Sequence, residues 1–502
     1  MRPLNPLVHG KDGAEGKSIL IIGCGDAGEK MCREILDNPG LNYHLAGFLD
    51  DDRTKWGRSL HGVRVYGPVE MLSDVIEREK IDEVLIAIPS ATGPQIRRIS
   101  EICKNSQVRY RTLPDLGSII DGKVSIKKLR DVRYEDLLRR PPVNLDTTEI
   151  QRYLWGKRVL VTGAGGSIGS ELCRQIIRFE PAELILVEAS EANLYDIQME
   201  LQHELNFPRH RCILSRVQIQ PLMEDVFNRF QPQAVFHAAA YKHVPLLENN
   251  PWEAIHNNVL GSKVVMKLAV KYGVERFVLV STDKAVRPTN VMGASKRLAE
   301  LIVQSLHGNG TRFMAVRFGN VIGSSGSVLP LFRRQLEQGG PITVTHPEVT
   351  RYFMTIPEAA QLILQAGGLG EGGEIFVLEM GTPVKIAQMA EELVRLSGKE
   401  PGKDVEIIFT GLREGEKLYE ELITQGEGIA GTRYDNILVL SNHDAWNGWK
   451  NQHEFSRWVN HNLEDLYRIA GTHDTNAIKA KLHEVLPEYS PQPDLNGVLG
   501  AT

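Results

Sequence analysis

The sequence is poor in cysteine and contains no long apolar run. Only five of its 502 residues are cysteines, and no two of them form a CxxC pair. This argues against a disulfide framework and a zinc site, so we expect no metal and a reducing compartment. No stretch of about 18 apolar residues occurs, and the N-terminus lacks the apolar core of a signal peptide. The sequence therefore predicts a cytoplasmic protein.

The sequence also lacks an excess of charge of one sign. Its 58 lysines and arginines are balanced by 63 aspartates and glutamates, which gives a net charge of −5. We therefore expect no nucleic-acid partner, although a local basic pocket could still bind a phosphate ligand. The hydrophobic share of 42% is ordinary for a soluble globular protein. A chain of this length exceeds one compact core, which predicts two or three domains.

Two segments of the sequence alternate between strand and helix patterns. In the first segment we expect strands at 18–22, 44–49 and 83–88 and a helix at 29–36. In the second segment we expect strands at 158–162, 184–187, 234–237 and 276–280 and a helix at 171–179. Such alternation is typical of parallel sheets covered by helices. The predicted fold class is α/β, with two Rossmann-like doubly wound parallel-sheet domains, the second carrying a smaller C-terminal substrate-binding lobe.

The domain boundaries are predicted from changes in composition. Residues 1–122 form the first Rossmann-like domain, and the charged, proline-containing stretch 123–156 is predicted to be a linker. Residues 157–440 form the second domain, whose substrate lobe lies mainly beyond residue 320. Residues 441–502 are a C-terminal extension to which the sequence assigns no role.

A glycine-rich turn follows the first strand of the second domain. Gly163, Gly166 and Gly169 stand between a strand and a helix, where glycine lets backbone N–H groups approach a pyrophosphate at a helix N-terminus. Glu188 follows about 20 residues later at a strand end, where an acid can bond a ribose 2′-hydroxyl and repel a 2′-phosphate. The sequence therefore predicts a dinucleotide site that prefers NAD to NADP.

The first domain has a glycine turn of its own. Gly23, Gly25 and Gly28 have the GxGxxG spacing, and Asp50 ends the next predicted strand. This turn could bind a second nucleotide, or it could belong to a degenerate domain kept for packing or assembly. Asp26 lies inside the turn and would repel a pyrophosphate, so we expect the degenerate form.

A cluster of reactive side chains follows the strand that ends at Val280. It contains Thr282, Asp283 and Lys284, and Met292 and Lys296 come shortly after. Here the sequence resembles the extended short-chain dehydrogenase/reductase family, and within it the long-form bacterial 4,6-dehydratases of polysaccharide biosynthesis that act on UDP-N-acetylglucosamine. The resemblance spans about 141–425 and rests on the motifs VTGAGGSIGSE, VFHAAAYKHVPLLE, NNVLGS, STDKAV, PTNVMGASKRLAE, RFGNVIGSSGSVLPLF, VTRYFMTIPEAA and LREGEKLYEEL.

The resemblance implies a reaction in which NAD takes a hydride from sugar C4, water is lost across C5 and C6, and the hydride returns to C6. It implies that Lys284 is the base at C5, Asp283 the acid at O6, Thr282 a partner of the C4 oxygen and Lys296 a partner of the nicotinamide ribose. A lysine base must be neutral and an aspartic acid donor protonated. Exchange of a proton between these neighbours would serve both needs, whereas an ion pair would shift both pKa values in the opposite direction. The sequence leaves both arrangements open.

Met292 departs from the YxxxK pattern of the wider family, in which a tyrosine takes the C4 hydroxyl proton. Methionine can neither accept nor donate that proton. The long-form dehydratases share this methionine, so the departure fits the subgroup. It leaves open whether Asp283 or a water takes the first proton.

The matched motifs imply further contacts. The predicted cofactor contacts are Gly163, Gly166, Ser167, Ile168, Gly169, Glu188, Ala238, Ala239 and Lys296. The predicted substrate contacts are Lys242, His243, Asn258, Met292, Arg317, Asn320, Arg351, Arg413 and Glu416. The family usually has an acidic residue near the adenine after the third strand. Here that stretch is 215–220, which has none, so the adenine contact is in doubt.

Two other functions fit the same scaffold. The first is a nucleotide-sugar epimerase acting at C4 or C5. An epimerase at C4 would need the tyrosine and no acid at C6, so Met292 and the Asp283–Lys284 pair argue against it. A non-catalytic NAD- or nucleotide-sensing assembly protein would not need the reactive set, which is intact here. The resemblance implies a UDP-sugar as partner, a homo-oligomer, and membrane association only in a longer form, of which this chain would be the soluble part.

Overall fold

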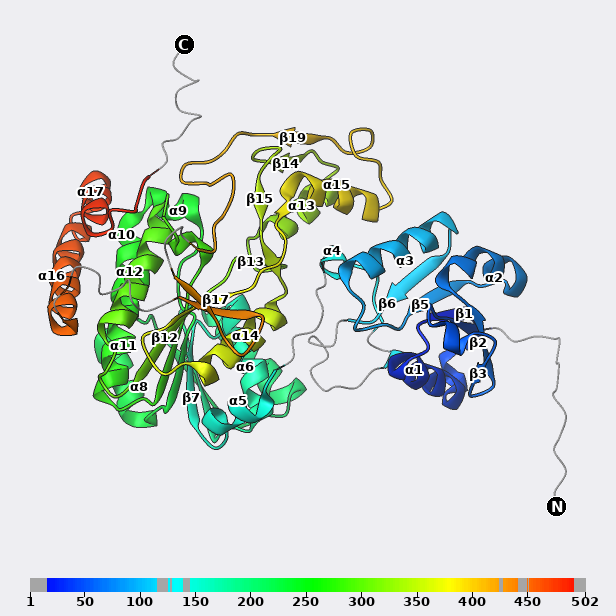
Figure 1. Cartoon of the computed structure of the whole chain (residues 1–502), viewed down its shortest axis with the longest axis horizontal. Coiled ribbons are helices and arrows are strands. Elements are labelled where there is room, and N and C mark those ends of the chain that lie inside the picture. Colours follow the sequence, from blue (N-terminus) through cyan, green and yellow to red (C-terminus); the bar gives the residue numbers. More distant parts are fainter. Residues whose placement is uncertain are drawn as a thin grey trace, which may run out of the picture. The chain divides into compact units, whose positions relative to one another are not determined.

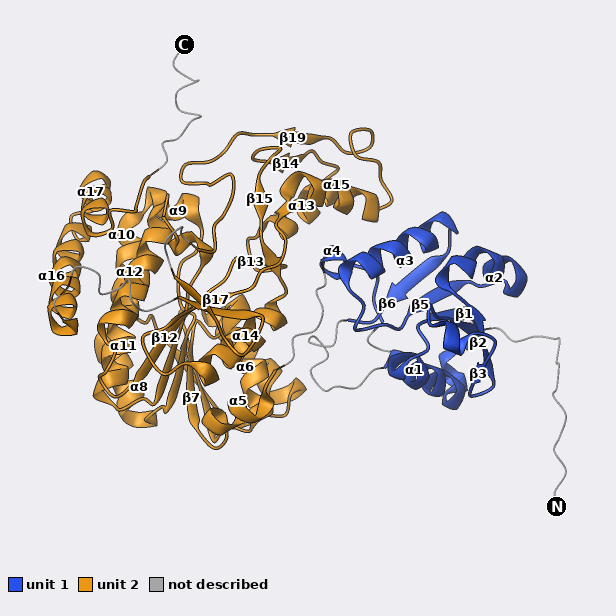
Figure 2. Cartoon of the chain, viewed as in Figure 1, with its two compact units in different colours: residues 1–142 blue, residues 143–502 orange. Residues whose placement is uncertain are grey.

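The structure is a computed structural model of the whole chain (Figure 1). The chain folds into two compact units (Figure 2). Unit 1 comprises residues 1–142 and unit 2 comprises residues 143–502. The described residues are 16–114, 125–126, 129–138, 145–423, 428–440, 449 and 451–491. No helix in these described stretches combines the length and the apolar character that a membrane span requires.

Unit 1 is built on a six-stranded sheet in the order β3-β4-β2-β1-β5-β6. All pairs are parallel except β3 with β4. Its strands are β1 (Lys17–Ile22), β2 (Tyr43–Leu49), β3 (Ser59–Leu60), β4 (Val63–Gly67), β5 (Glu83–Ile86) and β6 (Arg109–Thr112), and its longer helices are α1 (Asp26–Asp37), α2 (Leu72–Glu79) and α3 (Gly93–Asn105). The last four residues of β1 and all of β5 are buried, as expected of strands covered by helices on both faces. The first predicted Rossmann-like sheet is confirmed.

The glycine turn of unit 1 is hydrogen-bonded to Asp50, the residue that follows β2. Asp50 accepts a hydrogen bond from the Cys24 amide at 2.7 Å and pairs with Lys55 at 3.0 Å. A Cβ on Gly28 would stand 2.0 Å from the carbonyl oxygen of Gly23, so this glycine lets α1 lie against the turn. Asp50 and Gly28 therefore both have roles in packing.

Unit 2 contains a nine-stranded sheet in the order β20-β21-β17-β12-β11-β10-β7-β8-β9. Its strands are β7 (Arg158–Thr162), β8 (Glu183–Glu188), β9 (His210–Leu214), β10 (Ala234–His237), β11 (Arg276–Val280), β12 (Arg312–Arg317), β17 (Ile375–Leu378), β20 (Ile429–Gly431) and β21 (Ile437–Leu440). The strands from β9 to β17 run parallel, whereas β21 and β20 are antiparallel additions. The chain winds outward from β7 in one direction and then restarts at β10 on its other side. Ligands of such sheets bind at the carboxyl ends of the strands flanking this switch point.

Alternating side chains of these strands pack into two hydrophobic cores, one on each face of the sheet. Leu160 and Phe277 face the layer that contains α8 (Gln220–Phe230), α11 (Gly261–Lys271) and α12 (Val291–Ser305). Val161 and Phe236 face the layer of α5 (Thr147–Leu154), α6 (Ser167–Ile176), α7 (Glu191–Met199) and α14 (Ile356–Leu369). Figure 1 shows these two helical layers on either side of the sheet.

A smaller lobe is inserted after β12. It holds α13 (Val328–Glu337), α15 (Ile386–Leu396) and three two-stranded pairings: β13 (Asn320–Val321) with β16 (Phe353–Met354), β14 (Ile342–Val344) with β19 (Ile407–Phe409), and β15 (Thr350–Arg351) with β18 (Val384–Lys385). The predicted lobe beyond residue 320 is therefore present. However, the chain returns to the main sheet for α14 and β17 within this region.

The predicted linker at 123–156 is wrong, because its described parts belong to the two folded units. In unit 1, Glu34 accepts hydrogen bonds from Ser125 and Ile126, and Arg130 forms a two-pronged ion pair with the buried Asp136. In unit 2, Tyr153 on α5 donates a hydrogen bond to the Leu364 carbonyl of α14 at 2.7 Å. The charges of this stretch suggested a solvated connector, but several of them are used in pairing.

The C-terminal extension is part of unit 2. Its helices α16 (Gln452–Ala470) and α17 (Thr475–Val485) bury Leu466 and Leu482 in the same core as α12. Beyond α17, the Ser490 amide donates to the Pro288 carbonyl, and Glu488 pairs with Arg297 on α12. The extension thus braces α12 and the segment that leads into it.

Candidate active site

A cleft of about 1020 Å³ lies at the carboxyl ends of β7, β10 and β11 and is bordered by the smaller lobe. Its size is at the upper end of ordinary ligand cavities. The residues that line it include the glycine turn (within residues 163–169), the segments that follow β10 and β11, the start of α12 and side chains of the lobe. The structure therefore brings the predicted cofactor and substrate segments to one cavity.

The glycine turn has the geometry that its sequence predicts. Gly163 adopts φ +65°, and a Cβ there would stand 2.8 Å from the backbone of Ala239. A Cβ on Gly169 would lie 1.9 Å from the Gly163 carbonyl oxygen, so α6 can pack this closely only because residue 169 is glycine. The N-cap of α6, Gly166, offers no side-chain cap, and Ser167 and Ile168 line the cleft beside it. An uncapped helix start of this kind favours an anionic ligand.

Glu188 ends β8 as predicted, but its carboxylate is bonded to the backbone around it. It accepts hydrogen bonds from the amides of Gly165 at 3.0 Å and Ala189 at 2.8 Å. Glu188 thus ties the glycine turn to the end of β8, and it is not among the residues that line the cleft. The cleft wall here comes from Asn193 and Arg216, which sequence reasoning did not single out.

Ala238 lines the cleft, whereas Ala239 lies behind the glycine turn, where its backbone faces Gly163. His237, the last residue of β10, is fully buried and contacts the hydroxyls of Thr162 at 2.7 Å and Ser262 at 2.9 Å. Burial and the nearby Lys296 lower the pKa of His237 to about 3. His237 is therefore a neutral structural residue.

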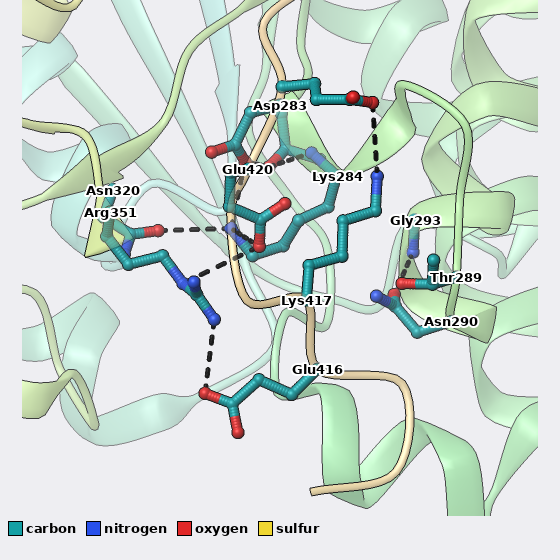
Figure 3. A network of polar contacts seen from close by, with 12 residues as sticks. Asp283, Lys284, Thr289, Asn290, Gly293, Asn320, Arg351, Glu416, Lys417 and Glu420 are labelled. Atoms are coloured by element: carbon teal, nitrogen blue, oxygen red, sulfur yellow. Dashed lines mark hydrogen bonds and ion pairs between the residues drawn. The ribbon is translucent and has the colours of Figure 1, made fainter. Parts of the chain in front are cut away.

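The segment after β11 forms a tight turn, here called the 281–285 turn (Figure 3). Asp283 is completely buried, and its Oδ1 accepts hydrogen bonds from Thr282 Oγ1 at 2.9 Å and Lys284 Nζ at 3.0 Å. Lys284 Nζ also donates to Asn320 Oδ1 at 3.2 Å. Within the described residues, Asp283 Oδ2 has no hydrogen-bond partner. A buried carboxylate oxygen without a partner is unusual and marks this group for a role other than packing.

The Asp283–Lys284 pair is an ion pair in this structure. Burial lowers the pKa of Lys284, but the negative charges of Asp283 and Glu420 outweigh it and hold the pKa above its usual range. Of the two arrangements that the sequence leaves open, the structure thus contains the ion pair. Lys284 must lose a proton before it can act as a base.

Helix α12 brings Met292 and Lys296 to the cleft one turn apart. Asn290 caps the helix by accepting a hydrogen bond from the Gly293 amide at 2.7 Å, and it donates to the Gly415 carbonyl at 3.0 Å. Burial, partly offset by Glu300, lowers the pKa of Lys296 to about 8. Both side chains line the cleft because they share one helix face.

Two predicted substrate contacts, Arg317 and Asn258, do not line the cleft. Arg317 is fully buried and forms a two-pronged ion pair with Glu300 on α12, at 2.8 and 2.7 Å. Glu300 also accepts a hydrogen bond from Ser281, so the pair clamps the start of the 281–285 turn. The Asn258 side chain accepts a hydrogen bond from the Tyr241 amide and donates one to the Tyr241 carbonyl. These bonds fix the segment that carries Lys242 and His243. Arg317 and Asn258 are both supports, because their side chains turn into the helical layer.

The remaining predicted substrate residues do line the cleft: Lys242, His243, Asn320, Arg351, Arg413 and Glu416. Burial lowers the pKa of Lys242, and burial together with Lys242 lowers that of His243. Arg351 pairs with Glu416 at 3.2 Å. The groups on this side of the cleft that are suited to a phosphate ligand are the guanidinium groups of Arg351 and Arg413.

Sequence reasoning missed Glu420. Its carboxylate lies 3.4 Å from Lys284 Nζ and 3.7 Å from Arg351 Nε, with only 3% of the side chain exposed (Figure 3). The only signal was its place in the LREGEKLYEEL motif, where Arg413 and Glu416 were singled out.

Comparison with known proteins agrees with this geometry. Residues 159–442 match the family described as polysaccharide biosynthesis protein, and residues 9–114 match a family described as a CoA-binding domain. The capsular polysaccharide biosynthesis protein CapD of Staphylococcus aureus is 47% identical over 427 residues, which cover 84% of this chain and 71% of CapD. The probable polysaccharide biosynthesis protein EpsC of Bacillus subtilis is 46% identical, over 87% of this chain and 73% of EpsC.

Among solved structures, Pen from Bacillus thuringiensis resembles this chain with a TM-score of 0.54 and 30% identity. The alignment covers 58% of this chain and 91% of Pen. The residues that line the cleft lie within the range 159–442 that matches the family. From the extent of these matches, and in agreement with the motifs in its sequence, the chain belongs to the polysaccharide biosynthesis protein family.

Proposed function

We propose that the protein converts UDP-N-acetylglucosamine to its UDP-4-keto-6-deoxy derivative by loss of water, with NAD recycled inside the cleft. The observation that carries this proposal is the 281–285 turn, in which the buried carboxylate of Asp283 contacts the Thr282 hydroxyl and the Lys284 amine. Thr282 and Lys284 line the cleft that also holds the glycine turn. Elimination of water next to a ketone needs one acid and one base close together. Asp283 and Lys284 meet that need.

The residues of the cleft fit the cofactor. The uncapped start of α6 and the close backbone approach at Gly163 suit a pyrophosphate, and Lys296 on α12 suits a nicotinamide ribose. NAD, when bound, would supply hydride chemistry by accepting a hydride from C4 and returning it to C6. Arg351, Arg413 and Lys242 would neutralise the substrate diphosphate.

The first proton of the reaction leaves the C4 hydroxyl, and Met292 cannot take it. Thr282 accepts a hydrogen bond from this hydroxyl and passes its own proton to Asp283 Oδ1, to which it is already bonded at 2.9 Å. The transfer that accompanies oxidation thus turns Asp283 into the acid needed next. The substitution of methionine for tyrosine is then no obstacle to catalysis.

The second stage is the elimination. Neutral Lys284 removes the C5 proton, made acidic by the C4 ketone, while protonated Asp283 donates to the C6 hydroxyl, which leaves as water. After the hydride reaches C6, Lys284 returns its proton to C5. Because one base on one face removes and returns the proton, we expect C5 to keep its configuration. The product would serve the synthesis of a bacterial surface glycan or glycoprotein, in the cytoplasm.

A labelled substrate tests this proposal. UDP-N-acetylglucosamine with deuterium at C4 should give a product lighter by one water that carries the deuterium at C6, because the hydride is returned within the cleft. An epimerase would give an isomer of unchanged mass, and a sensor protein would give no product. Either of these results would contradict the proposed dehydration.

A further inference from the structure

Lys284 lies between two buried carboxylates, and the reaction as described uses only one of them. Asp283 Oδ1 is 3.0 Å from Lys284 Nζ, and Glu420 Oε1 lies 3.4 Å from the same nitrogen (Figure 3). Asp283 is adjacent in sequence, whereas Glu420 comes from the segment after the smaller lobe. Within the described residues, Glu420 Oε2 is buried and has no hydrogen-bond partner.

Two cations, Lys284 and Arg351, pair with Glu420, and a third, Lys417, lies on the same segment but bonds elsewhere. Lys284 comes from the 281–285 turn and Arg351 from β15, where its Nε lies 3.7 Å from Glu420 Oε1. Lys417, from the same segment as Glu420, is directed elsewhere: its Nζ donates to the Val286 carbonyl at 2.9 Å. A buried carboxylate is costly unless it is paired, and a free oxygen on it is costlier still. Packing alone gives no reason to keep a glutamate here.

The proton balance of the reaction supplies a reason. At rest Lys284 forms ion pairs with the carboxylates of Asp283 and Glu420. The C4 hydroxyl proton neutralises Asp283 through Thr282, and Asp283 must keep that proton for the C6 hydroxyl. Lys284 is then still protonated and cannot remove the C5 proton. A second carboxylate in contact with Lys284 is needed to take its proton.

Resting on the proposed function, we propose that Glu420 receives the Lys284 proton during oxidation and returns it when the cycle ends. The transfer breaks one N–H bond of Lys284 and forms one O–H bond on Glu420, which leaves both neutral. Lys284 then takes the C5 proton and later gives it back, while the Asp283 proton leaves in the water. When Glu420 returns its proton to Lys284, all three groups are in their starting state. Glu420 acts through Lys284 and is therefore a positioning residue.

Two neighbouring glutamates allow a matched test. Glu420→Gln keeps the size of the side chain but cannot take up a proton. Glu421→Gln is the control, because Glu421 is the next residue, has 36% of its side chain exposed and pairs with Arg287 instead of Lys284. Glu420→Asp retains a carboxylate and tests whether an effect of glutamine comes from lost packing.

The first measurement is the limiting rate of dehydration of UDP-N-acetylglucosamine against pH. In the unmodified protein and in Glu421→Gln, the rate should be flat from neutral to mildly alkaline pH, because the proton stays inside the site. In Glu420→Gln the Lys284 proton must go to solvent, so the rate should fall about 100-fold near neutral pH. Above neutral pH the rate of this variant should increase with pH, by up to about tenfold per pH unit. Glu420→Asp should recover a flat profile. A normal rate in Glu420→Gln, or a slow rate with an unchanged pH profile, would overturn the proposal.

The second measurement needs no turnover. Acetic anhydride labels a lysine only in its neutral form, and mass spectrometry of the Lys284 peptide reports that labelling against pH. With one of its two anions removed, Lys284 should become reactive at lower pH in Glu420→Gln than in Glu421→Gln. Coincident labelling curves would overturn the role of Glu420. An unmodified protein that makes no dehydrated product would contradict the proposed function alone, since the labelling curves would still decide whether Glu420 holds the charge of Lys284.

Discussion

A Cβ on Gly293 would stand 2.1 Å from the carbonyl oxygen of Lys284. The start of α12 therefore lies directly against the 281–285 turn, and this approach is open only to glycine. It brings Met292 and Lys296 of α12 to the same cleft as Thr282 and Lys284 of the turn. The distance between α12 and the 281–285 turn depends on this contact.

Gly293→Ala should move α12 away from the 281–285 turn. Overpacking against backbone cannot be relieved by a rotamer change, so we expect a loss of about 1–3 kcal/mol in the free energy of unfolding. Turnover should fall by at least about 10-fold, because small displacements of catalytic groups are costly. Gly431→Ala is the control, since a Cβ at Gly431 meets nothing within 4 Å. Denaturant unfolding and dehydration rates measure both effects, and equal behaviour of the two variants would contradict the prediction.

Asp283→Asn should abolish dehydration but preserve cofactor binding. Asparagine keeps the shape of the side chain but can neither accept the Thr282 proton nor donate to the C6 hydroxyl. Loss of a positioned acid or base reduces rates by about 100- to 10,000-fold. Lys284→Ala should lose turnover to a similar degree. Bound NAD, measured after purification by release and absorbance, should be unchanged in both, and rapid turnover by either variant would remove its assigned role.

Met292→Leu should retain turnover within about threefold, because we assign no proton transfer to Met292 and leucine has a similar volume. Met292 is 4% exposed and lines the cleft. A polar replacement such as Met292→Gln is a useful contrast, since it would place an amide on the apolar part of the cleft wall where we propose that the sugar binds. Initial rates at saturating substrate provide the comparison. A loss of turnover in the leucine variant as large as that of Asp283→Asn would show that the sulfur takes part.

The parts of the fold and site that the sequence could predict are those set by local pattern. The strand–glycine–helix unit at 158–176 follows from short-range periodicity, and Met292 and Lys296 share a cleft because they lie one helical turn apart. Asp283 and Lys284 are neighbours whose contact needs no long-range information.

Side chains whose direction depends on distant packing could not be predicted in this way. Arg317 is the last residue of β12, but its side chain pairs with Glu300 on α12. Glu420 reaches Lys284 across 136 positions of sequence, and nothing local distinguishes it from Glu421. The linker prediction failed for the same reason. From the sequence, Arg130 and Asp136 suggest a solvent-exposed stretch, whereas in the structure they pair with each other.

Lys296 should make the stability of unit 2 depend on pH. Burial lowers its pKa to about 8 from a usual value of 10.5, so between these two values the unfolded chain holds a proton on this lysine and the folded chain does not. The free energy of unfolding therefore rises with pH across this window, and the cost of burying the charged form is fully present below it. Lys296→Met removes this ionisation. It should raise the free energy of unfolding by about 1–3 kcal/mol near neutral pH, with a gain that shrinks as pH increases from 8.

Denaturant unfolding of both proteins in the absence of added NAD, at several pH values, gives the difference curve. Lys296 lies 5% exposed beside the fully buried Glu300, so a residual attraction to that carboxylate would reduce the gain. The sign of the slope would stay the same, because the pKa of Lys296 remains below that of the unfolded chain. A difference between the two proteins that is constant with pH would mean that Lys296 keeps its proton throughout, and the burial argument for this residue would then fail.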